Sequence, residues 1–271
     1  MLNAIEISPK VWWVGGIDWN ERLFHGYTTE AGITYNAYLI MDEKITLIDT
    51  CKATFSNELV QRISQIVDPS KIDVVITNHV EMDHSGSLPV IHKIAPNAQI
   101  YASAGAGVKE VYAHFGIEAT PVKSGDTLCI GERTLTFVTT PMVHWPDNMV
   151  TYSDVDQILF SNDAFGQHFA TTKRFDDEND LCEIMQAGKA LAAVKGLDLK
   201  MIAPSHGCIW RSHIDKILAC YEDWTTYKTE EKAVVVFDSM WHSTEMMARE
   251  ICDAFIAEGI SAQLVDVKAT H

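Results

Sequence analysis

The chain has 271 residues, 47% of them hydrophobic, and a formal net charge of −16 at pH 7. This length allows one large domain or two, and the acidity argues against binding to nucleic acid or anionic membranes, which needs clustered Lys and Arg. No apolar run approaches the roughly 20 residues that cross a bilayer, and no signal peptide is visible at the N-terminus. Six scattered cysteines without a C-x-x-C pair predict a cytoplasmic protein and exclude a rubredoxin-like or zinc-ribbon module.

Short apolar runs alternate with segments of helical periodicity through most of the chain. The expected strands are Val11–Val14, Tyr35–Met41, Lys44–Asp49, Ile72–Thr77, Gln99–Ala102, Thr134–Thr140, Met149–Tyr152 and Gln157–Phe160. The expected helices are Phe55–Val67, a segment from Ser85 to Pro96, and Ala106–Phe115. Strands mixed with helices predict sheets covered by helices, an αββα layered α/β fold.

A polar connector, Tyr227–Lys232, separates this part from a shorter one. After it come an apolar strand (Ala233–Phe237), a polar loop, an amphipathic helix and the strand Ala262–Val267, which together form one β-loop-α-β unit. The sequence therefore predicts two domains, residues 1–230 and residues 231–271. A doubly wound domain needs about 100 residues or more, so we expect the second domain to be truncated here and the natural protein to continue.

Four potential metal ligands occupy six positions directly after the expected strand Ile72–Thr77: His79, Glu81, Asp83 and His84. In an extended loop alternate residues point the same way, so His79, Glu81 and Asp83 would converge while His84 faces a second point. One metal ion would leave some of these donors unused, whereas two ions would use them all.

Three further candidate ligands, His144, Asp163 and His206, also follow expected strands. Single His and Asp residues in turns are usually structural, but this set divides naturally into two metal sites that share one carboxylate. Asp163 is the expected bridge, because a carboxylate has an oxygen for each metal at the roughly 3.5–4 Å spacing of binuclear sites. Four imidazoles with three carboxylates and no thiolate favour iron, with zinc as the second choice.

The loop between the apolar strand Ala233–Phe237 and the following helix is a candidate phosphate site. A helix N-terminus binds phosphate through its free N–H groups and the helix dipole, although Ser and Thr there are also ordinary N-caps. The candidate residues are Ser239, Met240, His242, Ser243 and Thr244.

Together these motifs make the sequence resemble the flavodiiron proteins over essentially the whole chain. The N-terminal domain of that family has the metallo-β-lactamase fold, whose zinc hydrolases typically carry H-x-H-x-D-H, and Glu81 stands here in place of the middle His, as in the diiron branch. The resemblance implies one iron on His79, Glu81 and His144, another on Asp83, His84 and His206, and Asp163 as the bridge. It also places His25 near these ligands, where a structural role is nearly as well supported.

The resemblance further implies a diiron–FMN oxidoreductase that reduces O2 to water, NO to N2O, or both. Residues 231–271 would begin a flavodoxin-like, doubly wound α/β domain whose phosphate loop binds FMN. Electrons would come from a separate rubredoxin-like donor, and the chains would form a head-to-tail homodimer, or a tetramer built from it. Family members usually have about twenty more residues between Asp163 and the last His ligand; the shortage falls near Glu183–Gly188.

Two other functions remain open at this point. A zinc-dependent hydrolase of the metallo-β-lactamase fold would use a metal-bound hydroxide and would not need the flavodoxin-like segment. A non-catalytic iron or O2-sensing module would bind metal without turnover. The sequence does not distinguish O2 from NO as the substrate.

Overall fold

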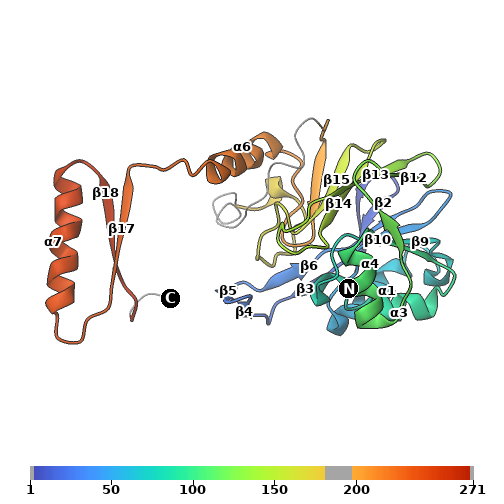
Figure 1. The fold of residues 1–271 in the computed structure, drawn as a ribbon, viewed down its shortest axis with the longest axis horizontal. Helices are drawn as coiled ribbons and strands as arrows, with labels where there is room; N and C mark the ends of the chain where they lie inside the picture. The colour runs from blue at the N-terminus through green and yellow to red at the C-terminus, as the bar shows by residue number, and fades with distance from the viewer. Residues whose placement is uncertain (1–2, 181–196, 269–271) are drawn as a thin grey trace. The chain divides into compact units, whose positions relative to one another are not determined.

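The computed structural model describes residues 3–180 and 197–268. The chain divides into two compact units, Met1–Glu222 and Asp223–His271 (Figure 1). The helical stretch expected near Glu183–Gly188 lies outside the described residues.

The larger unit contains a seven-stranded sheet in the order β1-β2-β7-β8-β9-β10-β11. Its first four strands pair antiparallel, whereas β8, β9, β10 and β11 run parallel to one another. The strands are β1 (Ile5–Ser8), β2 (Val11–Trp13), β7 (Tyr38–Ile40), β8 (Thr46–Ile48), β9 (Val74–Thr77), β10 (Gln99–Ser103) and β11 (Thr120–Val122).

A five-stranded sheet, β12-β13-β14-β15-β16, faces the first and is antiparallel except for the parallel pair β15 and β16. Its strands are β12 (Thr127–Cys129), β13 (Thr134–Thr139), β14 (Met149–Ser153), β15 (Ile158–Asn162) and β16 (Met201–Pro204). Two short antiparallel pairs complete the β structure: β3 (Gly16–Asp18) with β6 (Ile33–Tyr35), and β4 (Leu23–Phe24) with β5 (Tyr27–Thr28).

Helices α1, α3 and α4 cover the outer face of the seven-stranded sheet (Figure 1). The helices of this unit are α1 (Ser56–Ile63), α2 (Met82–Ser85), α3 (Leu88–Ile94), α4 (Ala106–Phe115) and most of α6 (Ile214–Thr225), with 3-10 turns η1 (Ala53–Phe55), η2 (Pro69–Lys71) and η3 (Asp176–Glu178).

Alternation along the strands separates two hydrophobic cores. In β7, Tyr38 and Ile40 point between the two sheets, where they join residues such as Phe137 and Phe160 of the second sheet. Leu39, on the opposite face of the same strand, packs in the second core among the covering helices. Because successive side chains of a strand point to opposite faces, one strand serves both cores, and its residues are buried throughout.

The layered arrangement agrees with the expectation from the sequence, but several elements differ. The helix expected from Ser85 to Pro96 is two helices, α2 and α3, and α2 begins earlier, at Met82. The helix expected over Phe55–Val67 ends at Ile63. Strands β1, β3 to β6, β11 and β12 were not foreseen; all but β1 have only two or three residues each, too few for a readable alternation.

The smaller unit is a β-α-β arrangement, as the sequence predicts. Strands β17 (Lys232–Phe237) and β18 (Ser261–Asp266) pair parallel, and α7 (Ser243–Ala257) connects them. Phe237, Ala248 and Cys252 are its buried apolar residues. Across residues 3–180 and 197–268, no helix is both long enough and apolar enough to cross a membrane.

The side chain of Arg133 joins three turns at one end of the sandwich. Its guanidinium donates to Asp156 Oδ2 at 2.7 Å, to Asp42 Oδ2 at 3.1 Å and to the carbonyl of Pro9 at 2.8 Å. Pro9 and Asp42 belong to turns of the first sheet, and Asp156 to a turn of the second. The three charged side chains are buried, so this arginine ties the two sheets together at the end away from the strand ends after β9 and β15.

Replacing Arg133 with Met should lower the free energy of unfolding by about 3–5 kcal/mol, because it leaves two buried carboxylates without their cation. Urea denaturation of the metal-free protein measures the change. The control is Lys10→Met, which removes an exposed ion pair with Glu132 and should cost less than about 1 kcal/mol. Equal losses in the two variants would contradict the role assigned to Arg133.

Candidate metal centre

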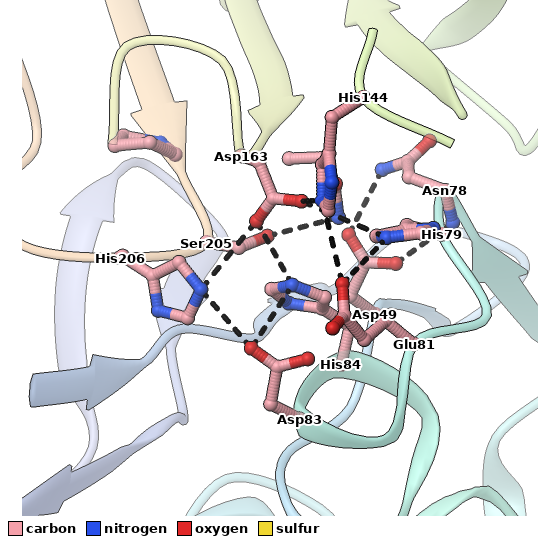
Figure 2. A network of polar contacts seen from close by, with 12 residues as sticks. Asp49, Asn78, His79, Glu81, Asp83, His84, His144, Asp163, Ser205 and His206 are labelled. Atoms are coloured by element: carbon pink, nitrogen blue, oxygen red, sulfur yellow. Dashed lines mark hydrogen bonds and ion pairs between the residues drawn. The ribbon is translucent and has the colours of Figure 1, made fainter. Parts of the chain in front are cut away.

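Four loops at one end of the sandwich carry the seven candidate ligands, and Figure 2 shows their side chains pointing toward one another. The segment after β9 carries His79, Glu81, Asp83 and His84. His144 lies between β13 and β14, Asp163 directly follows β15, and His206 lies just beyond β16. All seven residues proposed from the sequence are therefore gathered at one place.

The side chains form two groups, each with ligand atoms within 4.8 Å of one another: His79, Glu81, His144 and Asp163, and Asp83, His84 and His206. In the first group, the Nε2 atoms of His79 and His144 lie 3.1 and 3.3 Å from Glu81 Oε2. In the second, the Nε2 atoms of His84 and His206 lie 3.3 and 3.2 Å from Asp83 Oδ2.

Asp163 stands between the two groups and turns one oxygen toward each. Its Oδ2 lies 3.2 Å from His144 Nε2 and 3.8 Å from His79 Nε2. Its Oδ1 lies 2.9 Å from His84 Nε2 and 3.4 Å from His206 Nε2. This is the geometry that a carboxylate bridging two metal ions requires.

Asp83 does not converge with His79 and Glu81, so the expectation of an extended loop is wrong at this residue. Residues Met82–Ser85 form the short helix α2, so Asp83 and His84 leave the chain as neighbours on a helical turn. Asp83 therefore joins His84 in the second group, as the family resemblance implied, instead of joining His79 and Glu81.

The donor set fits metal ions, as its unsatisfied polar atoms show. Both carboxylate oxygens of Asp83 and Asp163 Oδ1 are buried without a hydrogen-bond partner in the described part of the chain, although imidazole nitrogens lie close by. Buried polar atoms normally find partners, and atoms that converge on a common point without bonding to one another are suited to a cation at that point.

The pKa values of the ligand side chains in the absence of metal also indicate a site suited to cations. Hydrogen bonds with Asp163 and Glu81 raise the pKa of His144 to about 9. Burial disfavours the charged rings of His79 and His206, yet their carboxylate neighbours raise the pKa of each to about 10. Burial opposes ionisation of Asp163, but His84 and the other imidazoles hold its pKa well below the ordinary range.

Buried polar residues next to the ligands hold the loops in place. Asp49 Oδ1 accepts from the backbone N–H of Asn78 at 2.7 Å, directly before His79. Asn162, which precedes Asp163, donates to Ser205 Oγ at 3.2 Å, directly before His206. Asn148 Oδ1 accepts from the N–H of Trp145, directly after His144, at 2.6 Å. These contacts set the directions in which the ligand side chains leave the backbone.

Asp147, which the sequence did not point to, contacts a candidate ligand directly. Its Oδ2 accepts from His79 Nδ1 at 2.9 Å and from the N–H of Val80 at 2.7 Å. A carboxylate on the far nitrogen of a ligating imidazole fixes its tautomer and orientation. The one sequence signal was an acidic residue three positions after His144, which is too common a pattern to identify it.

His25 lies at the edge of the site, in the turn between β4 and β5. Its Nε2 is 3.1 Å from Glu81 Oε1, and its side chain is 45% exposed. It therefore contacts a candidate ligand from the solvent side.

The phosphate-loop candidates Ser239, Met240, His242, Ser243 and Thr244 lie where β17 leads into α7. Met240 is exposed, and His242 is the N-cap residue of α7 in a left-handed conformation. Glu245, in the first turn of this helix, accepts from His242 Nδ1 at 2.8 Å. The loop has the setting expected from the sequence, at the carboxyl end of a strand and the start of a helix.

The stability of the metal-free protein should fall as the pH rises from 6.5 to 9. The pKa values of His79, His144 and His206 lie above the ordinary 6.5, so their stabilising contribution is complete below 6.5 and is lost as the pH rises through the raised values. The midpoint of thermal unfolding across this range measures the effect. His144→Gln should reduce the slope, and a midpoint that stays level or rises would contradict the prediction.

Comparison with known proteins agrees with these features. Residues 33–207 match the family described as ODP family beta lactamase. A nitric oxide reductase of Moorella thermoacetica is 41% identical over 97% of this chain and 72% of its own length. The aligned span of 286 positions exceeds the 271 residues of this chain, so the relative has residues within it that this chain lacks.

Two solved structures share the fold over nearly the whole chain. The rubredoxin oxygen:oxidoreductase of Desulfovibrio gigas superimposes with a TM-score of 0.91 and 36% identity over 99% of this chain and 73% of that one. The flavodiiron protein of Giardia intestinalis has a TM-score of 0.92 and 33% identity over 98% of this chain and 70% of that one. The larger unit is thus a metallo-β-lactamase-like domain, and the chain belongs to the flavodiiron protein family.

Proposed function

We propose that this protein is a diiron oxidoreductase that reduces O2 to water, NO to N2O, or both. The observation that carries the proposal is the position of Asp163, whose two oxygens face two groups of imidazole and carboxylate ligands. The names of its relatives, a nitric oxide reductase and a rubredoxin oxygen:oxidoreductase, support the same two substrates.

In this proposal His79, Glu81 and His144 hold one iron, and Asp83, His84 and His206 hold the other. Asp163 would bind both. The two groups contain no cysteine, and a mixed set of imidazoles and carboxylates suits iron better than the thiolate- and imidazole-rich shells of zinc.

Bound ferrous ions would supply two electrons, and a reduced flavin two more, which with four protons take O2 to two waters. Two NO molecules need two electrons and two protons to give N2O and one water. The exposure of the ligand side chains indicates from which side small molecules reach the centre. The side chains of His144 and His25 are 50% and 45% exposed, whereas those of Asp83, His84 and His206 are buried. We infer that gas and protons enter beside Glu81.

The smaller unit is proposed to begin a flavodoxin-like domain that binds FMN. Its parallel strands joined by a helix, with Ser239, Ser243 and Thr244 at the helix start, have the form of the first phosphate-binding turn of such a domain. Electrons would come from a rubredoxin-like donor, as the name of the rubredoxin oxygen:oxidoreductase suggests. The free cysteines of the described residues fit a cytoplasmic location.

The proposed head-to-tail homodimer, or a tetramer built from it, would bring the flavin of one chain to the metal centre of another. Large apolar side chains are exposed on the two loops that border the centre, with Leu23 at 68% and Met142 at 71%. Both loops also carry residues of the site, His25 and His144. Exposed apolar side chains beside a charged centre are suited to a partner surface.

The purified protein should contain two iron ions per chain. Given reduced rubredoxin under an anaerobic atmosphere, it should consume O2 or NO that is then added in known amounts. Metal analysis and gas-electrode assays measure both properties. A protein that holds zinc and consumes neither gas would contradict the proposal in favour of the hydrolase. Iron without turnover would favour a sensing module.

Replacing Glu81 with Ala should reduce the iron content from two ions per chain to about one, because it removes the anionic ligand that two imidazoles of the first group face. Glu118→Ala, a change of the same chemistry at an exposed helix-to-strand connection, serves as the control and should retain both ions. If the Glu81 variant also keeps both, the ligand assignment is wrong.

A further inference from the structure

Two residues hold the loop that carries His206. Thr34 lies in β6, and Asn36 directly follows this strand. The carbonyl of Thr34 lies 2.6 Å from His206 Nδ1, and its hydroxyl accepts from the N–H of Gly207 at 2.7 Å. These bonds fix the ring of His206 from behind and the residue that follows it.

Asn36 holds the same loop at three backbone carbonyls. Its own N–H donates to Ser205 at 2.7 Å, and its Nδ2 donates to Pro204 at 2.8 Å and to Gly207 at 3.2 Å. Pro204 and Gly207 lie on opposite sides of His206 in the sequence, so one amide group spans the turn that presents the imidazole. The Asn36 side chain is fully buried.

Trp13 determines which way the Asn36 amide points. Its indole N–H donates to Asn36 Oδ1 at 2.8 Å. An indole N–H can only donate and the loop carbonyls can only accept, so the amide has one orientation that satisfies both. Trp13 is itself immobilised, with the guanidinium carbons of Arg62 and Arg174 at 4.9 and 4.4 Å from its ring centre.

We propose that Asn36 is a positioning residue for the metal position formed by Asp83, His84 and His206, and that it acts on that position selectively. This inference rests on the proposed binuclear centre. The hydrogen bonds of Asn36 reach the loop of His206 and not the loops of His79 or His144. Residues that orient a metal ligand typically change metal affinity 10–100-fold when they are replaced.

The test is a double-mutant cycle with metal retention as the measurement. Full-length wild type and Asn36→Leu are loaded with metal and dialysed against graded chelator concentrations, and iron and zinc are counted together. Asn36→Leu should release one of the two ions at about 10–100-fold lower chelator concentration and leave the other unchanged. The same change is then made in His144→Ala and in His206→Ala backgrounds.

In the His144→Ala background the remaining ion should be weakened by the same factor, whereas in His206→Ala the Asn36 change should add nothing, because the residue it positions is gone. Equal weakening in both backgrounds, or none in either, would overturn the inference. A wild-type chain that retains two zinc ions would contradict the proposed iron chemistry and still test Asn36.

Trp13→Phe provides a second route if Asn36→Leu unfolds. It removes the N–H that orients the amide and keeps an aromatic ring beside the two guanidinium groups, although the smaller phenyl ring also leaves buried volume unfilled. Circular dichroism of the metal-free protein verifies the fold. Selective loss of the same ion, smaller in size, is the expected result, and unchanged retention in a folded Trp13→Phe variant counts against the role of the amide.

Discussion

The carboxylate of Asp163 is the group on which the rest of the site depends. It can face two sets of ligands only if four loops, drawn from both sheets, end at the same place. That requirement explains why so many buried polar side chains occur at this end of the sandwich. Asp49, Asn78, Asn148, Asn162 and Ser205 each bond to a residue next to a ligand or precede one directly. The ligands are held in position mainly by these buried polar residues, which do not themselves face the metal positions.

Buried carboxylates from both sheets meet at each end of the sandwich, and they face different cationic groups at the two ends. At the end away from the metal centre, one guanidinium with several fixed donors joins turns of both sheets. At the metal end no fixed cation takes that place among the seven ligands, whose carboxylates instead face imidazoles. A permanent cation there would compete with metal ions for the carboxylates, whereas an imidazole can give up its proton when a metal ion arrives.

The sequence predicted the features that depend on local pattern. Long apolar strands, the ligand-rich run after β9 and the later His and Asp residues could all be recognised, because each follows a strand whose alternation or apolar run is readable. The placement of Asp83 was wrong, since nothing in the spacing shows that a helical turn starts at Met82. Asp147 and Asn36 were invisible because their importance comes from partners 68 and 168 residues away.

The raised pKa values of the imidazoles have a consequence for assembly. Four neutral imidazoles and three carboxylates would leave three negative charges crowded in a mostly buried space. Protons bound to the imidazoles offset that charge while no metal is present. With that charge offset, we expect the metal-free chain to keep its fold, unlike small domains that fold only around their ion. Metal uptake then becomes an exchange of cations for protons, so acidity and metal supply jointly determine how much of the protein is loaded.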